Sequence, residues 1–272
     1  MTAITTPRAT TTAPRPAIGW ALPDAITIAW RNLKGAMRTP EVIVFSTIQP
    51  IIFVLNFRYV FGGAISVGLP KGLPYVDFLM PGVFAQTVTF GSVGTAVGMA
   101  QDLQLGLIER FRSLPMSRSA VLAGRTLADL VRGSFVIVLM ILVGFAVGFR
   151  VHTNAFGLLG AFALLVLFMF SLSWVFAAVG LAIKNPEAAQ AASFPLIAVL
   201  VFASSAFVPV RSMPGWLQAY ADHQPVTDVV DAVRAMCIGG PTAGKVLIAV
   251  AWSVGMIAAF APVAIVRYRR AA

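Results

Sequence analysis

The sequence has few charged residues for its length. Of its 272 residues, 58% are hydrophobic and only 11% are Asp, Glu, Lys or Arg, whereas a soluble domain carries about 25% charged residues. So few charges cannot cover the surface of a water-soluble globule of this size, which excludes a soluble enzyme, a disordered chain and a coiled coil. Together with a mean hydropathy of +0.87, this composition predicts an all-α protein that crosses a membrane several times.

Cysteine and histidine are also scarce. The single Cys237 excludes an internal disulfide and a thiolate metal cluster, and we interpret it as a small apolar packing residue. His152 and His223 have no partner motif such as HExxH, so no metal site is expected. The 20 Lys and Arg residues are spread along the chain. Because they form no single basic patch, no nucleic-acid partner is expected.

The N-terminal part has two sections. Residues 1–19 are rich in Thr, Pro, Ala and Arg without an apolar period, and are expected to form a disordered tail rather than a signal peptide. Residues 20–272 are expected to form one transmembrane domain. It begins with an amphipathic helix over about 24–38, whose polar side carries Arg31 and Lys34 and whose apolar stripe includes Trp30. Such a helix is typical of the membrane–water interface.

Six charge-poor runs follow, and a helix needs about 20 apolar residues to cross the hydrocarbon core. The predicted spans are approximately 42–62, 78–101, 133–149, 157–183, 190–210 and 246–266. Small residues in the second run (Gly91, Gly94 and Gly98) favour close helix packing, either within the chain or across a dimer face. The sequence therefore predicts a six-span protein with both termini on one side.

The distribution of basic residues predicts which side is cytoplasmic, because cytoplasmic loops carry an excess of Lys and Arg. One face carries 14 of them: Arg8, Arg15, Arg31, Lys34, Arg38, Arg110, Arg112, Arg118, Arg125, Arg132, Lys184, Arg267, Arg269 and Arg270. The other carries 6: Arg58, Lys71, Arg150, Arg211, Arg234 and Lys245. Both termini are therefore expected in the cytoplasm, with the chain in the cell membrane.

Acidic residues are absent from all six predicted spans, and Arg58 is the only full charge within one. Ion-coupled carriers place an ionisable group at membrane depth, so this absence favours an external energy source over a self-contained carrier or channel. Residues 239–245 match GxxxxGK, but Val246 stands where a P-loop needs Ser or Thr, and no strand is predicted before it. No ATP site and no catalytic constellation are expected on this chain.

Two connections between spans are informative. In the cytoplasmic one, Leu103, Leu107, Phe111 and Leu114 recur at helical spacing and predict an amphipathic helix that ends at Pro115. This helix fits either the headgroup layer or a soluble partner. After the fifth span, Pro209, Pro214 and Pro225 separate apolar pieces too short to cross, which predicts re-entrant or interfacial helices at the outer leaflet. They could form a gate or a static lid.

At these two connections the chain resembles a known family. The run LIERFRSLPMSR at residues 107–118 resembles the cytoplasmic signature of ABC-2 type permeases. The runs KNPE at 184–187, VP at 208–209, MPGWL at 213–217 and QPVT at 224–227 resemble the daunorubicin-resistance type of drug exporter subunit. The likeness runs from about residue 24 through nearly the whole chain, in the same order.

The resemblance implies the membrane subunit of an ATP-binding-cassette exporter that moves a lipophilic drug- or antibiotic-like molecule outward. Such a permease pairs with a second copy or a homologous permease, and with two copies of a separate ATPase that binds ATP and Mg²⁺. A lipid or glycan-precursor cargo remains an alternative. The residues it assigns to ATPase coupling are Leu107, Glu109, Arg110, Phe111, Arg112 and Leu114. It assigns Trp30, Arg31 and Lys34 to the interfacial helix, and Pro209, Met213, Pro214 and Trp216 to an outer re-entrant gate.

Overall fold

The computed structural model describes residues 26–27, 29–30, 33–34, 40–66, 72–106 and 118–271. Every regular element in these ranges is a helix. The predicted tail and the run 107–117 lie outside them. The parts of the N-terminal amphipathic segment that are described are helical, as expected.

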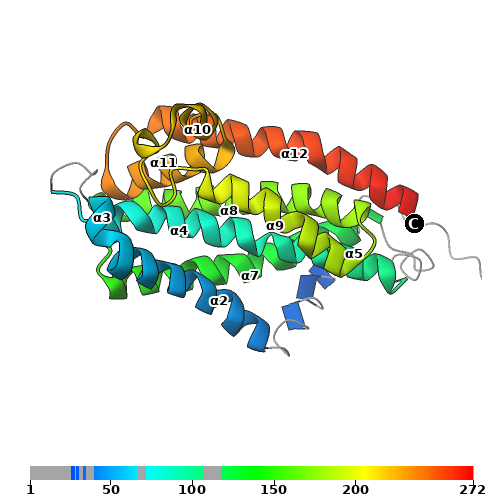
Figure 1. The fold of residues 1–272 in the computed structure, drawn as a ribbon. Coiled ribbons are helices and arrows are strands. Elements are labelled where there is room, and N and C mark those ends of the chain that lie inside the picture. Colours follow the sequence, from blue (N-terminus) through cyan, green and yellow to red (C-terminus); the bar gives the residue numbers. More distant parts are fainter. Residues whose placement is uncertain are drawn as a thin grey trace, which may run out of the picture.

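The helices run back and forth along one axis (Figure 1). They begin with α2 (Pro40–Leu55), which continues through a π-helical turn, η1 (Asn56–Phe61), into α3 (Gly62–Ser66). The long helices that follow are α4 (Tyr75–Gly91), α5 (Val93–Gln104), α7 (Arg118–Val147), α8 (Ala155–Ala182) and α9 (Pro186–Phe202). A 3-10 turn, η2 (Val210–Ser212), then precedes α10 (Gly215–Ala221), α11 (Pro225–Ile238) and α12 (Ala243–Ala271).

Four stretches in the described part are long and apolar enough to cross a membrane: Tyr75–Gln104, Ala123–Val147, Ala155–Ala182 and Ala243–Arg270. They coincide with four of the predicted spans. The first and fifth predicted spans correspond to shorter apolar helices, Thr47–Phe61 and Pro186–Phe202. The fifth helix ends eight residues before the predicted boundary at 210, because the chain leaves helical geometry at Ala203.

The boundaries of the second and third spans require a correction. The stretch Ala123–Val147 begins well before residue 133 and includes Asp129, and Tyr75–Gln104 includes Asp77 and Asp102. The prediction that these helices lack acidic residues is therefore wrong. A search for charge-free runs stops at the first charge, whereas a helix continues when that charge has a partner in a neighbouring helix.

Local chemistry explains where the helices begin and bend. The Asn154 side chain accepts a hydrogen bond from the Gly157 amide and starts α8, and Asn185 caps α9 in the same way. The turn at Ser92 separates α4 from α5. Its hydroxyl donates to the carbonyl of Val88 over 2.9 Å, and such backbone bonding by Ser and Thr bends helices.

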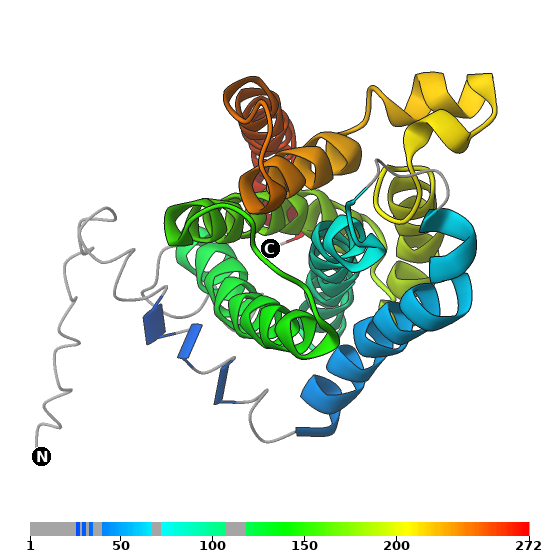
Figure 2. The ribbon, with the colours of Figure 1, turned by 90° about the vertical axis from the view of Figure 1, so that its left-hand side faces the viewer.

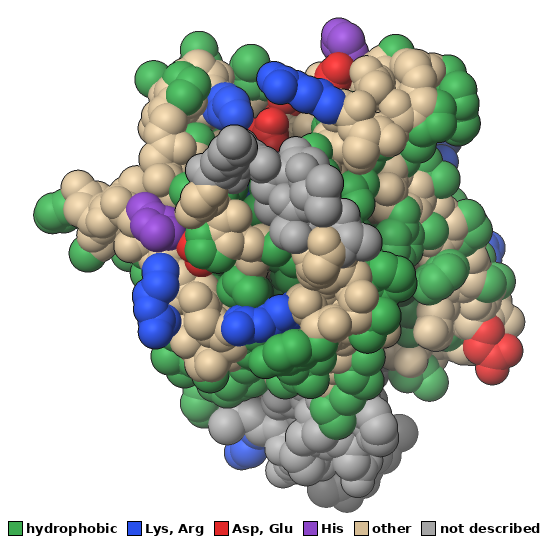
Figure 3. Space-filling view, turned by 60° about the vertical axis from the view of Figure 1, so that its left-hand side comes forward, with side chains coloured by type: hydrophobic (Ala, Val, Ile, Leu, Met, Phe, Trp, Pro, Cys, Tyr) green, Lys and Arg blue, Asp and Glu red, His purple; other side chains and the backbone are tan. Residues whose placement is uncertain are grey.

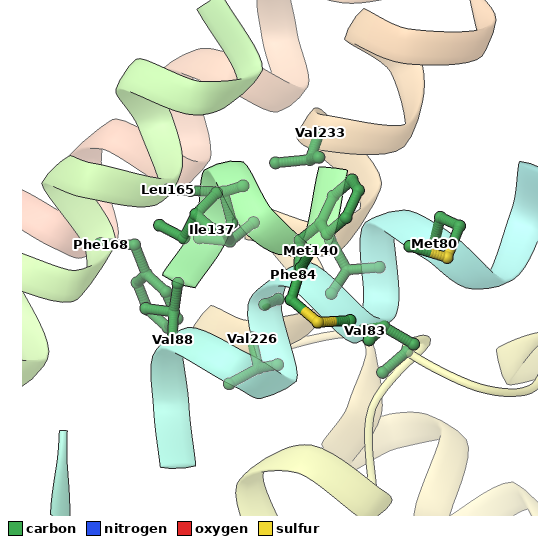
Figure 4. Packing of buried hydrophobic residues seen from close by; sticks show 14 of the residues in the cluster. Met80, Val83, Phe84, Val88, Ile137, Met140, Leu165, Phe168, Val226 and Val233 are labelled. Carbon is green, nitrogen blue, oxygen red and sulfur yellow. The ribbon is translucent and has the colours of Figure 1, made fainter. Parts of the chain in front are cut away.

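Helix α8 lies at the centre of the bundle and packs against α4, α5, α7, α11 and α12. Figure 2 shows this arrangement from the end, with α2 and α12 on opposite sides. Apolar side chains from α4, α7, α8 and α11 interlock in the core, among them Phe84, Ile137, Leu165 and Val233 (Figure 4). Gly180 of α8 lies directly against the backbone of Ala96, so only a glycine permits this approach.

Candidate functional site

The two ends of the bundle differ in content. One, which we call the C-terminal end, carries the last residues of α5, the first residues of α7, the α8–α9 turn and the C-terminus (Figure 1). The other, which we call the α10 end, carries α10, α11 and the turn 148–154. Each end has its own cluster of paired polar side chains.

At the C-terminal end, polar side chains join α5 to α7. The guanidinium of Arg125 pairs with the carboxylate of Asp102, and the two side chains are 18% and 19% exposed. One turn further into the bundle, the Thr95 hydroxyl donates to Asp129 over 2.7 Å, and the same carboxylate lies 3.5 Å from Arg132. We call these five residues the α5–α7 ladder. It joins the two helices that flank residues 107–117.

Two glycines make room for the arginines of the ladder. A Cβ atom at Gly98 would overlap the guanidinium of Arg125, and one at Gly94 would lie 2.8 Å from that of Arg132. At Gly94 and Gly98 the close packing lies within the chain, as one of the two alternatives predicted, whereas a Cβ atom at Gly91 meets nothing within 4 Å. What Gly94 and Gly98 accommodate is charged side chains rather than a bare helix backbone.

At the α10 end, Asp77 is a buried carboxylate, 1% exposed. Its Oδ1 accepts the backbone N–H of Arg150 over 2.9 Å, and its Oδ2 lies 2.8 Å from Nε2 of His152. Asp77 therefore ties the start of α4 to the turn between α7 and α8. These partners satisfy a carboxylate that would otherwise be costly to bury.

Arg234 of α11 is the centre of a second group at this end. Its guanidinium donates to the carbonyls of Phe78 and Ser205, lies 2.8 Å from Asp231 and stacks 3.8 Å from the centroid of the Phe78 ring. Burial lowers the pKa of Arg234 to about 10, although Asp231 opposes this shift. The side chain thus stays charged at neutral pH. Figure 3 looks toward this end, where acidic and basic side chains gather among apolar ones.

The segment between α9 and α11 is held by backbone contacts. The Gln224 amide donates to the carbonyls of Leu200 and Ala203, both over 3.0 Å, and the Tyr75 hydroxyl donates to that of Phe207 over 3.0 Å. Pro209 and Pro214 precede η2 and α10, which confirms that prolines divide this segment into short helical pieces. Met213 is buried here, whereas Trp216 is 75% exposed.

The remaining predicted residues lie partly inside and partly outside the described ranges. Leu107, Glu109, Arg110, Phe111, Arg112 and Leu114, as well as Arg31, lie outside the described residues. Trp30 and Lys34 are exposed on helical segments. Burial raises the pKa of the Cys237 thiol to about 12, which fits its interpretation as a packing residue. In the part that the structure describes, no group of three or more His, Cys, Asp or Glu could hold a metal ion.

Sequence reasoning missed the ladder, although a signal was present. Gly94, Gly98 and Asp102 are spaced four apart along one face of a helix. Arg125, Asp129 and Arg132 follow at spacings of four and three on the next helix. Two such faces, one of small and acidic residues and one of alternating charge, are complementary when the helices pack antiparallel.

The sequence of this chain is similar to those of known transport proteins. Residues 24–238 match the ABC-2 type transporter family. The chain is 34% identical over 255 residues to the daunorubicin resistance ABC transporter permease protein DrrB1 of Streptomyces coeruleorubidus, covering 94% of this chain and 89% of that protein. It is 30% identical over 194 residues to the doxorubicin resistance ABC transporter permease protein DrrB of Mycobacterium tuberculosis (strain ATCC 25618 / H37Rv), covering 69% and 66% of the two chains.

Proposed function

The chain belongs to the ABC-2 type transporter family, and we propose that it moves a lipophilic molecule of the daunorubicin kind out of the cell. It is the permease subunit, and a separate ATPase subunit supplies the free energy. The observation that carries this function is the similarity to a daunorubicin resistance permease along 94% of the chain. We therefore assign to this protein a cargo of the kind for which that related permease is named.

In the proposed topology the chain crosses the membrane six times, with both termini in the cytoplasm. The four long apolar stretches supply four of the crossings. The helical run from α2 through α3 and the helix α9 supply the other two, the latter extended by the turn that follows Phe202. Basic residues support this orientation, since Arg125, Lys184 and Arg267 all lie at the C-terminal end, which becomes the cytoplasmic end.

The proposed complex contains two permease chains and two ATPase chains, and ATP and Mg²⁺ bind to the ATPases. The connection after α5 docks into the ATPase, with Glu109 and Arg110 at the contact. The helix predicted over about 102–116 does not begin at 102, because residues 102–104 belong to α5 and the chain turns at Leu105 and Gly106. The N-terminal helix, with Trp30, Arg31 and Lys34, lies beside it in the headgroup layer. The α5–α7 ladder supports this route, because the Asp102–Arg125 pair joins the two helices that continue from the docking connection into the membrane.

The proposed outer gate is the segment with Pro209, Met213, Pro214 and Trp216. Its position at the α10 end, opposite the last residues of α5 and the first residues of α7, supports this role (Figure 1). The residues just before it are bonded to α11 and α4, because Arg234 donates to the carbonyl of Ser205 and Tyr75 to that of Phe207. These bonds support a route from α4 to the gate. Coupling of this kind needs an element with two arrangements that both sites bias.

Purification of the permease from its own cells tests the assembly. The expected result is an ATPase chain at one copy per permease, and a permease that purifies without one contradicts the assignment. The double variant Glu109→Lys/Arg110→Glu then tests the docking connection. It is expected to insert normally and to lose most of the cargo-stimulated ATP hydrolysis, and full stimulation in that variant would refute the docking role.

A further inference from the structure

A cavity of about 380 Å³ lies within the chain, between α2, α4, α5, α7, α8 and α9. Its lining includes Gly91 and Ser92, which lie near the middle of the Tyr75–Gln104 stretch, so the cavity lies near the middle of the membrane-crossing length. Its deep side is formed by buried residues such as Gln86 and Ile137, and Gly91 and Gln190 are exposed at its mouth. This volume is in the range of pockets that hold drug-sized ligands.

Most of the cavity wall is apolar. Val88, Val136, Ile137 and Met169 form its buried part. Phe90 and Phe194 stand at the mouth with their ring centroids 6.4 Å apart and their planes at 81°, an edge-to-face pair. Such a surface favours a flat or ring-shaped hydrocarbon body, which can contact both rings and the thioether of Met169.

One polar group in this wall has unused hydrogen-bonding capacity. Gln86 is 2% exposed, and its Oε1 has no hydrogen-bond partner among the described residues. Nearby hydroxyls are already committed, since Thr87 donates to Val83, Ser92 to Val88 and Thr95 to Asp129. An amide oxygen left without a partner at membrane depth is costly, and a hydroxyl of a bound molecule would satisfy it by donating a hydrogen bond.

The lining also contains one acid and one base, Asp129 and Arg132, which are paired with each other. The wall therefore carries no net charge. It offers no uncompensated counter-ion to a charged group at its deep side, so an ionised group of the ligand belongs at the mouth, where Gln49 and Gln190 are exposed.

We infer that this cavity is a cargo site contained within a single permease chain. Its ligand is a planar, polycyclic molecule with hydroxyl groups along one edge, which donate to the Oε1 of Gln86. That edge bonds to Gln86, and the rings lie between Phe90, Phe194 and Met169. The inference rests on the proposed export function. It adds a route of communication, because Thr95, Asp129 and Arg132 belong both to the cavity wall and to the α5–α7 ladder.

Two glycines allow a matched test of the site. A Cβ atom at Gly91 meets nothing within 4 Å, and its backbone is not in the left-handed region, so Gly91→Phe adds a bulky side chain at the mouth and its first atom meets no clash. Gly255 of α12 also has open space around its Cβ and does not line the cavity, so Gly255→Phe is the control. Gln86→Met keeps the length of the side chain and removes its amide.

The experiment uses the permease–ATPase complex in lipid nanodiscs, with daunorubicin as the probe and equilibrium dialysis as the measurement. Gly91→Phe is expected to weaken binding at least tenfold, and Gly255→Phe to leave it unchanged. Gln86→Met is expected to weaken binding about twofold to tenfold, the contribution of one hydrogen bond. ATP-driven uptake of daunorubicin into inverted vesicles is measured in parallel.

Each outcome decides between the proposals. Unchanged binding in Gly91→Phe, an equal loss in Gly255→Phe, or no binding by the wild-type complex overturns the cavity assignment. Binding that follows the expected pattern without ATP-driven uptake supports the cavity and overturns the export function. Uptake that persists unchanged in Gly91→Phe supports export and overturns the cavity.

Discussion

The Asp102–Arg125 pair offers the sharpest test of the proposed coupling between the permease and its ATPase subunit. The variant Asp102→Asn removes one charge and changes little else in size or shape. Exposed ion pairs contribute about 0.2–1 kcal/mol, and breaking a buried pair costs about 3–5 kcal/mol. Because these side chains are 18% and 19% exposed, the free energy of unfolding is expected to fall by about 1–3 kcal/mol.

Loss of the Asp102–Arg125 ion pair is expected to have two measurable consequences. In a protein of this size, 1 kcal/mol corresponds to about 2–4 °C in the unfolding temperature, so the purified complex is expected to unfold roughly 2–12 °C lower. Daunorubicin-stimulated ATP hydrolysis is expected to fall about fivefold or more, because a coupling free energy of 1–3 kcal/mol changes the linked equilibrium by that amount.

Glu187→Gln is the matched control. It removes the same charge at the same end of the bundle, from an exposed residue in the first turn of α9. Only a small effect is expected, since a carboxylate in the first turn of a helix contributes about 0.3–1 kcal/mol. Equal behaviour of the two variants in both assays would refute the reasoning. A lower unfolding temperature with undiminished stimulation would reduce the pair to a structural contact.

Three further predictions concern the α10 end. Arg234→Met is expected to destabilise the protein by about 1–3 kcal/mol, because it leaves two carbonyls without their donor and removes one partner of Asp231, which keeps Ser205 and Lys245; an unfolding temperature equal to that of the wild type would contradict this. Burial raises the pKa of Asp228 above its ordinary value of 3.8, and the hydrogen bond from Trp252 opposes the shift. The folded state therefore holds this proton more tightly than the unfolded state, so stability is lost as pH rises through the raised pKa. Asp228→Asn should unfold at a temperature that depends less on pH above about 4, and an unaltered pH profile would exclude this residue. Trp216→Ala removes a side chain that is 75% exposed, so daunorubicin transport is expected to change while the ATPase still co-purifies at the same ratio; loss of assembly would make Trp216 a structural residue.

Much of the architecture follows from composition and periodicity. Long apolar runs predicted the helices α8 and α12 almost to their ends, because nothing in those runs competes with helix formation. Pro209, Pro214 and Pro225 predicted the breaks after α9, because a proline cannot continue a helix without losing a backbone hydrogen bond. Both effects are local, because each depends only on residues that are neighbours in the sequence.

The paired charges could not be located in the same way. Whether Asp129 ends a membrane helix or lies inside it depends on Thr95 and Arg132, and Thr95 is 34 residues away in the chain. Asp77 is similar, since its partners lie at Arg150 and His152. A charge is tolerated at depth only when such partners are in place, and that is a property of the packed structure rather than of any single segment.

The buried, unreactive thiol of Cys237 makes this protein well suited to spectroscopic labelling. It is the only cysteine in the sequence and is 0% exposed in the described structure, so a maleimide reagent is expected to leave it unmodified in the folded protein. A cysteine introduced at an open glycine such as Gly91 or Gly255 would then carry a spin label alone. Distances between the labels of the two permease chains in the proposed dimer could be followed through the ATP cycle without first replacing the native cysteine.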